Sequence, residues 1–237
     1  MSLLVWNIEW ATPRSKRGAA IQGIIADLQP DLICMTEGTA AMLPDDGHTI
    51  EGSADYGYVA PGERRKVLLW SRSHWTDVDR VGDEQMPGAR FIGGTTGGIR
   101  VVGVCIPWRD AHVRTGRKDR KPWQDHLAYL AGLRRVLEAT DGPAVVAGDF
   151  NQRLPRRRQP KTVHEALMGA MGSSWRIISA GVVDDDGADL IDHVAVSPDL
   201  DGRVTGTIPR VTPHGVRLSD HPAVLVEIRL GSGGEES

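Results

Sequence analysis

The chain has 237 residues, of which 40% are hydrophobic, and a formal net charge of −3 at pH 7. This length and apolar content suffice for one hydrophobic core, so we expect a single domain over residues 1–230 and a disordered tail at 231–237. No apolar run approaches the ~18 residues of a membrane span and no secretory signal opens the chain, which argues against a membrane protein and predicts a soluble, cytoplasmic one.

Apolar runs and helical periodicity alternate in the first half of the chain. They predict, in chain order, a strand at 3–8, a helix through 21–28, a strand at 31–35, a hairpin of 56–60 with 66–71 and a hairpin of 89–95 with 99–106. Ser15 is the candidate N-cap of the helix, and Pro30 ends it. Pro61-Gly62 and Gly97-Gly98 supply the turns of the two hairpins. Both cysteines fall within these strands, which is typical of reduced core thiols.

The second half of the chain contains more strands than helices. The expected elements are a helix through 127–137, a strand at 144–147, a short helix from 162, and strands at 175–180, 190–196, 203–209 and 223–230. Thr162 and Glu165 have the spacing of a capping box at the start of the short helix. Because strands outnumber helices by about two to one and hairpins mix with crossovers, we predict an α/β (α+β) protein of mixed sheets packed on each other, with outer helices.

Short acidic and amide motifs stand at the ends of apolar runs along the whole chain. They are Trp6-Asn7-Ile8-Glu9, Thr36-Glu37-Gly38, Gly148-Asp149-Phe150-Asn151, Ile191-Asp192-His193 and Ser219-Asp220-His221. A sheet holds the ends of its strands rigid beside an open crevice, so these five ends predict one site. Asp192 and His193 alternate onto opposite faces of a strand, and we assign Asp192 to the site and His193 to a structural or surface role.

Basic residues gather in two segments that directly follow expected strand ends, 109–121 and 153–161. There they could line a cleft and attract phosphates, with Trp108 and Trp123 as a stacking platform for bases. The alternative interpretation is a pair of solvated loops in which the tryptophans are packing anchors. The sequence leaves both interpretations open.

Taken together and in this order, the motifs resemble the endonuclease/exonuclease/phosphatase family of metal-dependent phosphoesterases, which includes DNase I-like nucleases and exonuclease III-like abasic-site endonucleases. The resemblance runs from Trp6 to Val226, and the segment 66–72 is also similar to a strand of that family that ends in Ser-Arg. The resemblance implies a four-layered αββα sandwich of two mixed sheets, DNase I-like, with the site at one edge of the two sheets.

The resemblance also implies a role for each motif. The catalytic residues that it implies are Asn7, Asp149, Asn151, Asp192 and His221, and the metal ligands are Glu37, Glu9 and Asp220. Asp149 would orient or deprotonate the attacking water, while the two asparagines hold the phosphate and the nucleophile in line. His221, polarised by Asp192, would either stabilise charge as an imidazolium or act as the base, and the sequence does not separate the two.

The chemistry of phosphodiester hydrolysis explains why these residue types belong together. The reacting phosphorus is crowded and anionic, so catalysis needs positive charge on its nonbridging oxygens and an activated water. Carboxylates and carboxamides are hard oxygen ligands, which suit Mg²⁺, or alternatively Mn²⁺. We therefore expect Mg²⁺ as the cofactor.

One position departs from the family's pattern. Where the family has a catalytic Tyr or His, the matching residue here is Cys105, which we expect to be a small buried hydrophobic residue. Either Arg109 or His112 in the following loop takes over the contact with phosphate, or activity is reduced, or the alignment is shifted by one residue. We list Arg109, His112 and Arg153 as candidate substrate-binding residues.

The predicted function is a Mg²⁺-dependent phosphodiester hydrolase, an endonuclease or exonuclease acting on the DNA or RNA backbone, with nucleic acid as the partner. A small-molecule phosphoesterase with a substrate like an inositol phosphate is an alternative, because clustered arginines would attract such polyanions too. A noncatalytic phosphate- or nucleic-acid-binding relative is another, and Cys105 favours it. A binding module has no need of Asp149 and His221 together, which argues for the enzyme. We expect a monomer without membrane attachment.

Overall fold

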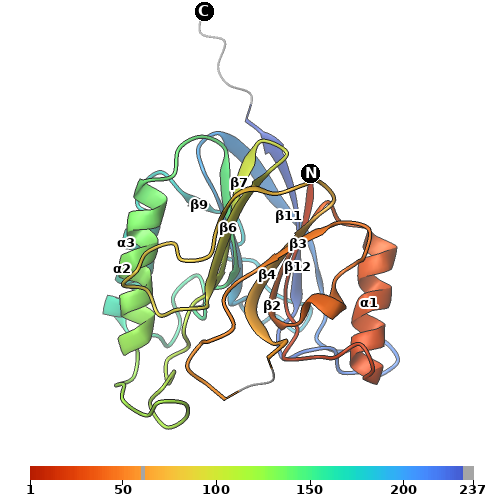
Figure 1. The fold of residues 1–237 in the computed structure, drawn as a ribbon, viewed down its shortest axis with the longest axis horizontal. Coiled ribbons are helices and arrows are strands. Elements are labelled where there is room, and N and C mark those ends of the chain that lie inside the picture. The colour runs from red at the N-terminus through yellow and green to blue at the C-terminus, as the bar shows by residue number, and fades with distance from the viewer. Residues whose placement is uncertain (60–61, 232–237) are drawn as a thin grey trace, which may run out of the picture.

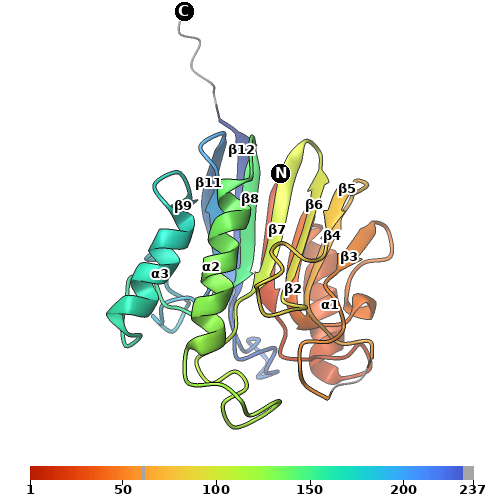
Figure 2. The same ribbon diagram turned by 60° about the vertical axis from the view of Figure 1, so that its left-hand side comes forward.

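The computed structural model describes residues 1–59 and 62–231, which form two six-stranded sheets packed face to face (Figure 1). Helix α1 (Lys16–Leu28) covers the outer face of one sheet, and α2 (Gln124–Glu138) and α3 (Lys161–Met171) cover the outer face of the other (Figure 2). These four layers confirm the predicted αββα sandwich. None of the helices in the described part of the chain is both long and apolar enough to cross a membrane.

The first sheet has the strand order β11-β12-β1-β2-β4-β3. Its strands are β1 (Ser2–Asn7), β2 (Leu32–Gly38), β3 (His48–Glu51), β4 (Arg65–Ser71), β11 (Leu200–Ile208) and β12 (Ala223–Leu230). β1 and β2 are parallel, as a crossover through α1 requires. Ile21 and Ile25 of α1 pack on this sheet, and Ser15 caps the helix as predicted, because its Oγ accepts from the Gly18 N–H at 3.0 Å.

The second sheet has the strand order β5-β6-β7-β8-β10-β9. Its strands are β5 (Thr76–Asp79), β6 (Phe91–Thr96), β7 (Ile99–Cys105), β8 (Ala144–Asp149), β9 (Arg176–Ile177) and β10 (Asp192–Val196). β6 and β7 form the predicted hairpin, and β7 and β8 are parallel neighbours joined through α2. Tyr129, Leu130 and Leu133 of α2 are buried against the outer face of this sheet.

A separate apolar cluster fills the space between the two sheets. It includes Val5 and Leu69 from the first sheet and Val101, Val145 and Val194 from the second, each at most 1% exposed. Burying a side chain of this kind contributes about 1.5–3 kcal/mol. The two sheets therefore form a rigid base for the polar residues at their ends.

The predicted pairing of β4 is wrong. β4 pairs with β2 and with the short strand β3, not with residues 56–59, which are irregular, and residue 60 lies outside the described part of the chain. The predicted turn at Pro61-Gly62 includes Pro61, which lies outside the described residues. β3 and β5 are four residues long each, and β5 is largely exposed, so neither has an apolar pattern that reveals it in the sequence.

Two other element ends differ from the prediction. α3 begins at Lys161 behind Pro160, so Thr162 lies inside the helix and no capping box forms. The predicted strand at 175–180 is reduced to β9. Gly231, assigned to the tail, donates its N–H to Asp199 O at 2.7 Å, while residues 232–237 lie outside the described part.

Candidate active site

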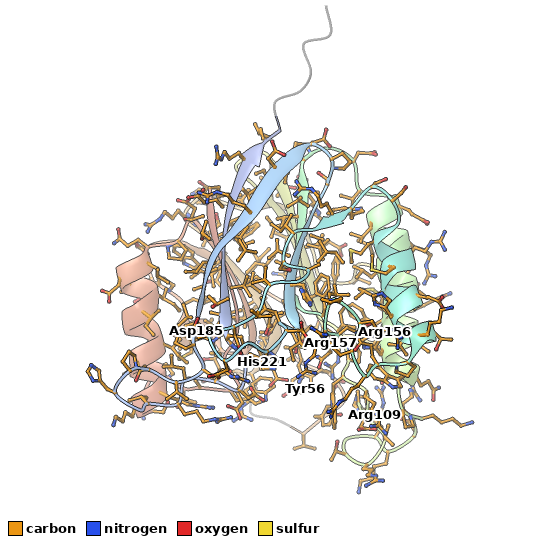
Figure 3. The ribbon with its side chains drawn as sticks, turned by 180° about the vertical axis from the view of Figure 1, so that it is seen from behind. Tyr56, Arg109, Arg156, Arg157, Asp185 and His221 are labelled. Carbon is orange, nitrogen blue, oxygen red and sulfur yellow. The ribbon has the colours of Figure 1, made fainter. Side chains whose placement is uncertain are left out.

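Several strand ends meet at one edge of the sandwich. Asp149 ends β8, and its register partners are Cys105 at the end of β7 and Asp192 at the start of β10. In the other sheet, Asn7 at the end of β1 is the register partner of Thr36 in β2, and Thr36 directly precedes Glu37. Figure 3 shows His221, which precedes β12, at this edge. Two parallel strand pairs, one in each sheet, thus present their carboxyl ends side by side.

Asp149 is held by two asparagines. Its Oδ2 accepts from Asn7 Nδ2 at 3.2 Å and from Asn151 Nδ2 at 2.9 Å, and its Oδ1 accepts from the Asn151 N–H at 2.9 Å. The bond from Asn7 joins the two sheets. Gly148 has φ +136, and a Cβ there would lie 2.0 Å from Val104 O, so only glycine fits directly before Asp149.

Asp192 and His221 form the predicted acid–imidazole pair. His221 Nδ1 lies 2.5 Å from Asp192 Oδ2. Ser219 positions the ring, because its Oγ accepts from the His221 N–H at 3.2 Å and donates to Asn7 O at 2.6 Å. Asp149, Asp192 and His221 are all buried, and one ligand atom from each lies within 4.8 Å of the others. The structure therefore brings together all five predicted catalytic residues.

Burial and neighbouring charges shift the pKa values of this cluster. Burial alone would lower the pKa of His221, but the charge of Asp192 and its hydrogen bond raise it to about 10. Burial raises the pKa of Asp149 well above its usual range, against the opposing charge of His221, and the charges of Asp192 and Glu37 add to the rise. Near neutral pH, His221 is therefore an imidazolium and Asp149 holds a proton more readily than an exposed carboxyl does.

His193 has the structural role that the sequence favours. Its Nδ1 lies 2.9 Å from Ser179 Oγ and its Nε2 lies 3.0 Å from Gln152 O. The ring is fully buried, and burial lowers its pKa to about 4. It is therefore neutral and engaged at both nitrogens, on the opposite side of the strand from Asp192.

Glu37 is paired with a lysine that the sequence analysis did not single out. Lys66 Nζ lies 2.5 Å from Glu37 Oε1, and the lysine side chain is only 10% exposed. The ammonium also lies 5.0 Å from the ring centroid of Trp10 and 5.3 Å from that of Tyr56. The one signal in the sequence is that Lys66 is the sole charged residue in the otherwise apolar run of 66–70.

The two other predicted metal ligands lie outside the buried cluster. Glu9 forms ion pairs with Arg17 at 2.8 Å and Arg217 at 2.7 Å. Burial would raise the pKa of Glu9, but hydrogen bonds from Arg217 and Arg17 lower it overall. Asp220 is 55% exposed, with Oδ1 3.8 Å from His221 Nε2. A metal-binding role for either stays a prediction, and for Glu9 it requires that the arginines move.

Cys105 is buried, as expected, and an arginine lies beside it. Its N–H donates to Arg90 O at 2.9 Å, and Arg90 Nη1 lies 3.9 Å from its Sγ and 3.5 Å from its carbonyl oxygen. Burial raises the pKa of Cys105 to about 12, so the thiol stays protonated. Sequence reasoning missed Arg90, whose only signal is its place directly before the apolar run of β6.

The predicted substrate-binding residues differ in exposure. Arg109 and Arg153 are exposed, and Arg109 lies 3.5 Å from Asp110. His112 is buried, its N–H donates to the Tyr58 hydroxyl at 3.0 Å, and its ring stacks on that of Tyr58 at 4.4 Å. Packing thus accounts for the position of His112, and its contact with phosphate stays a prediction.

The two basic segments are partly neutralised. Arg120 pairs with the buried Asp125 at 2.7 Å, and Arg157 pairs with Asp189 at 2.5 Å. Arg156 and Arg158 are exposed, and no carboxylate among the described residues lies within 4.0 Å of either. Figure 3 shows Arg109, Arg156 and Arg157 on the α2–α3 side of His221. Some of these charges are therefore satisfied internally and others face solvent, and attraction of phosphates by these segments stays a prediction.

The sequence matches the model of the Endonuclease/Exonuclease/phosphatase family over residues 4–221. The chain belongs to this family. No curated protein sequence matches it. The fold is similar to that of an AP endonuclease from Archaeoglobus fulgidus, with a TM-score of 0.69 and 16% identity over 97% of this chain and 100% of that one.

Two other solved structures have a similar fold. A 3′ phosphatase (NExo) from Neisseria, bound to a product DNA hairpin, has a TM-score of 0.67 and 20% identity over 97% of this chain and 99% of that one. A humanized D. rerio TDP2 has a TM-score of 0.69 and 14% identity over 97% and 98%. The name of the family covers nucleases and phosphatases, which are hydrolases of phosphoesters, and the resemblance seen in the sequence is confirmed at this level.

Proposed function

We propose that this family member is a Mg²⁺-dependent phosphodiester hydrolase that cleaves the DNA or RNA backbone. The observation that carries the proposal is the buried cluster of Asp149, Asp192 and His221, held in place by Asn7 and by Ser219 across two sheets. Buried ionisable groups are costly, and a fold retains them in such a cluster when chemistry depends on them.

The residues present fit a divalent cation. Asp192 Oδ1 is buried without a hydrogen-bond partner in the described part of the chain, and the carboxylates of Glu37 and Asp149 lie near enough for their charges to interact. Oxygen donors of this kind suit Mg²⁺. Glu37 would hold the ion, which would supply positive charge to the phosphoryl oxygens and lower the pKa of bound water.

Two side chains of the cluster carry the other catalytic roles, which are charge stabilisation and proton acceptance. His221, charged near neutral pH, donates a hydrogen bond to a phosphoryl oxygen and stabilises the charge that develops there. This choice between the two roles left open by the sequence follows from the raised pKa of His221. Asp149, whose pKa is also raised, accepts a proton from the attacking water, and Asn151 Nδ2 keeps its carboxylate oriented.

Nucleic acid is the substrate that the surroundings of the site favour. Arg153, Arg156 and Arg158 are exposed in the segment that directly follows Asn151, where a polyanionic backbone would pass. The NExo structure of similar fold holds a DNA hairpin product. No base-reading module is evident in the sequence, so we propose recognition of backbone and shape.

A plasmid-nicking assay with Mg²⁺ or EDTA tests the proposal. The wild-type protein should nick supercoiled DNA only with the metal, and Asp149→Asn should lose at least about 100-fold in rate. Asp184→Asn is the matched control, because it also changes a buried, paired aspartate, bound to Arg210 at 3.0 Å. Turnover of soluble phosphoesters without nicking would favour the small-molecule enzyme, and an inactive but DNA-binding protein would favour the noncatalytic relative.

A further inference from the structure

A buried arginine without a carboxylate partner lies beside the catalytic cluster. Arg90 is 2% exposed, and its Nη2 is buried with no hydrogen-bond partner among residues 1–59 and 62–231. Its Nη1 has only the long contacts with Cys105 described above, and within the same residues no carboxylate lies within 4.0 Å of the guanidinium. A buried guanidinium normally has an anionic partner, so this arrangement indicates that an anion binds here.

A second cation reaches the same position from the other sheet. Arg90 Nη1 lies 3.9 Å from Cys105 Sγ, the strand of Lys66 (β4) packs against the strand of Cys105 (β7), and the positive charges of both residues act on the thiol. Cys105 is in register with Asp149 on the neighbouring strand, and neighbouring strands lie about 4.8 Å apart. Arg90 lies on the β6 side of Cys105, so the backbone positions of Arg90 and Asp149 are about two strand spacings apart with the thiol between them.

We propose that Arg90 and Lys66 form a phosphate-binding pair that contacts the scissile phosphate beside Cys105. The inference rests on the proposed function and adds the groups that hold its substrate. A protonated thiol is a weak hydrogen-bond donor, whereas a guanidinium and an ammonium make charge-assisted hydrogen bonds to phosphate oxygens. The pair thus supplies the strong hydrogen-bond donors to phosphate that Cys105 lacks. Burial does not separate Arg90 from the chemistry, because Asp149 and Asp192 are 3% and 1% exposed.

A purely structural role for the guanidinium explains less. The Tyr129 hydroxyl donates to Arg90 O at 2.8 Å, and the Cys105 N–H donates to the same oxygen. Both bonds use the backbone carbonyl, which any residue at this position provides. The side chain itself makes no short hydrogen bond within the described residues, so an apolar side chain of similar length would preserve the local packing.

Calorimetric titration of the full chain with inorganic phosphate, without divalent ions, tests the proposal. Arg90→Met and Lys66→Met should each weaken phosphate binding by at least about 10-fold, which is the loss of one charge-assisted hydrogen bond. Arg203→Met is the control for the loss of one charge, because Arg203 pairs with Glu227 at 2.6 Å on the surface of β11 and β12, and it should change binding by less than about 2-fold. Wild-type binding that Arg90→Met leaves unchanged, or no binding by the wild type, would overturn the proposal.

A second measurement covers the case in which Arg90→Met does not fold. Arg90→Lys keeps the charge and should bind phosphate more weakly than the wild type because the two-pronged donor is lost. In the wild type, titration with phosphate should shift the ¹⁵N NMR signal of the Arg90 Nε–H, and the midpoint of that shift should agree with the affinity measured by calorimetry. A signal that does not move at saturation would rule the site out.

If phosphate binds through Arg90 but no phosphoester is cleaved, the proposed function fails alone. If cleavage occurs and Arg90→Met keeps both KM and phosphate affinity, the phosphate site fails alone.

Discussion

Asp192→Asn isolates the effect of the buried carboxylate on His221. The pKa of His221 is raised from 6.5 to about 10, mainly by Asp192 against the opposing effect of burial. That difference corresponds to roughly 5 kcal/mol in favour of the imidazolium. In the variant, the charge of Asp192 no longer opposes the effect of burial on the pKa of His221, so we expect that pKa to be at or below 6.5. At pH 8 a ring with that pKa is protonated in only about 3% of molecules, so kcat/KM should fall about 30-fold if the imidazolium is the acting form.

The same pair makes stability depend on pH. Because the folded pKa of His221 is raised, its contribution to the free energy of unfolding is fully present below pH 6.5 and is lost as pH rises toward about 10. Wild-type protein should therefore lose stability over this interval. In Asp192→Asn the slope should be largely absent and stability at neutral pH lower by up to roughly 5 kcal/mol.

Two measurements check this reasoning. NMR titration of the His221 ring gives its pKa directly, and the pH profile of hydrolysis of a chromogenic phosphodiester shows whether the basic limb moves. Asp184→Asn serves again as the control, because it breaks the ion pair of another buried aspartate, with Arg210, and does not contact the His221 ring. A ring pKa that stays near 10 in Asp192→Asn would refute Asp192 as the cause of the raised pKa. A pH profile that stays unchanged although the ring pKa falls, or that shifts equally in both variants, would refute the imidazolium as the acting form.

Three further changes have expected outcomes. Gly148→Ala should lower the free energy of unfolding by about 3 kcal/mol or more, measured by denaturant titration, because its Cβ would meet Val104 O at 2.0 Å. Ser179→Ala should cost about 1–3 kcal/mol by removing the bond to His193 Nδ1, with the pH profile of activity unchanged, and a changed profile would contradict the structural role of His193. Mg²⁺ at ten times its Kd should stabilise the wild type by about 1.4 kcal/mol in a thermal melt, whereas Glu37→Gln should show less than half of this gain.

The sequence predicts the backbone of the site well because strand ends and alternation are local properties. Asp192 and His193 could be assigned to opposite faces of β10 from their adjacency alone, and the contacts of both residues agree with that assignment. Mixed sheets packed on each other with outer helices followed from the pattern of strands and helices, and the resemblance to the family implied the four layers. Short exposed strands such as β5 have no such pattern, which is why they were missed.

Side-chain partners of the acidic residues could not be predicted in the same way. Whether Glu37 meets Lys66 depends on the register of β2 against β4, and whether Glu9 meets Arg217 depends on a contact 208 residues apart in the chain. Both are tertiary properties. In the structure the carboxylates predicted as metal ligands each have a cation close by, and their metal-binding role stays a prediction.

The charges of the site are nearly balanced before any substrate or ion is present. Glu37 is offset by Lys66 and Asp192 by the His221 imidazolium, whereas no cation among the described residues lies within 4.0 Å of the Asp149 carboxylate, on which the charge of His221 acts from a longer distance. Two amides bind its carboxylate but carry no charge, which is why burial can raise its pKa. On the other side of Cys105, Arg90 is a cation left without an acid. A carboxylate on β8 and a guanidinium beside β6, with β7 and Cys105 between them, are suited to a substrate that brings a water to the first and an anionic oxygen to the second. A phosphodiester and its attacking water meet both requirements.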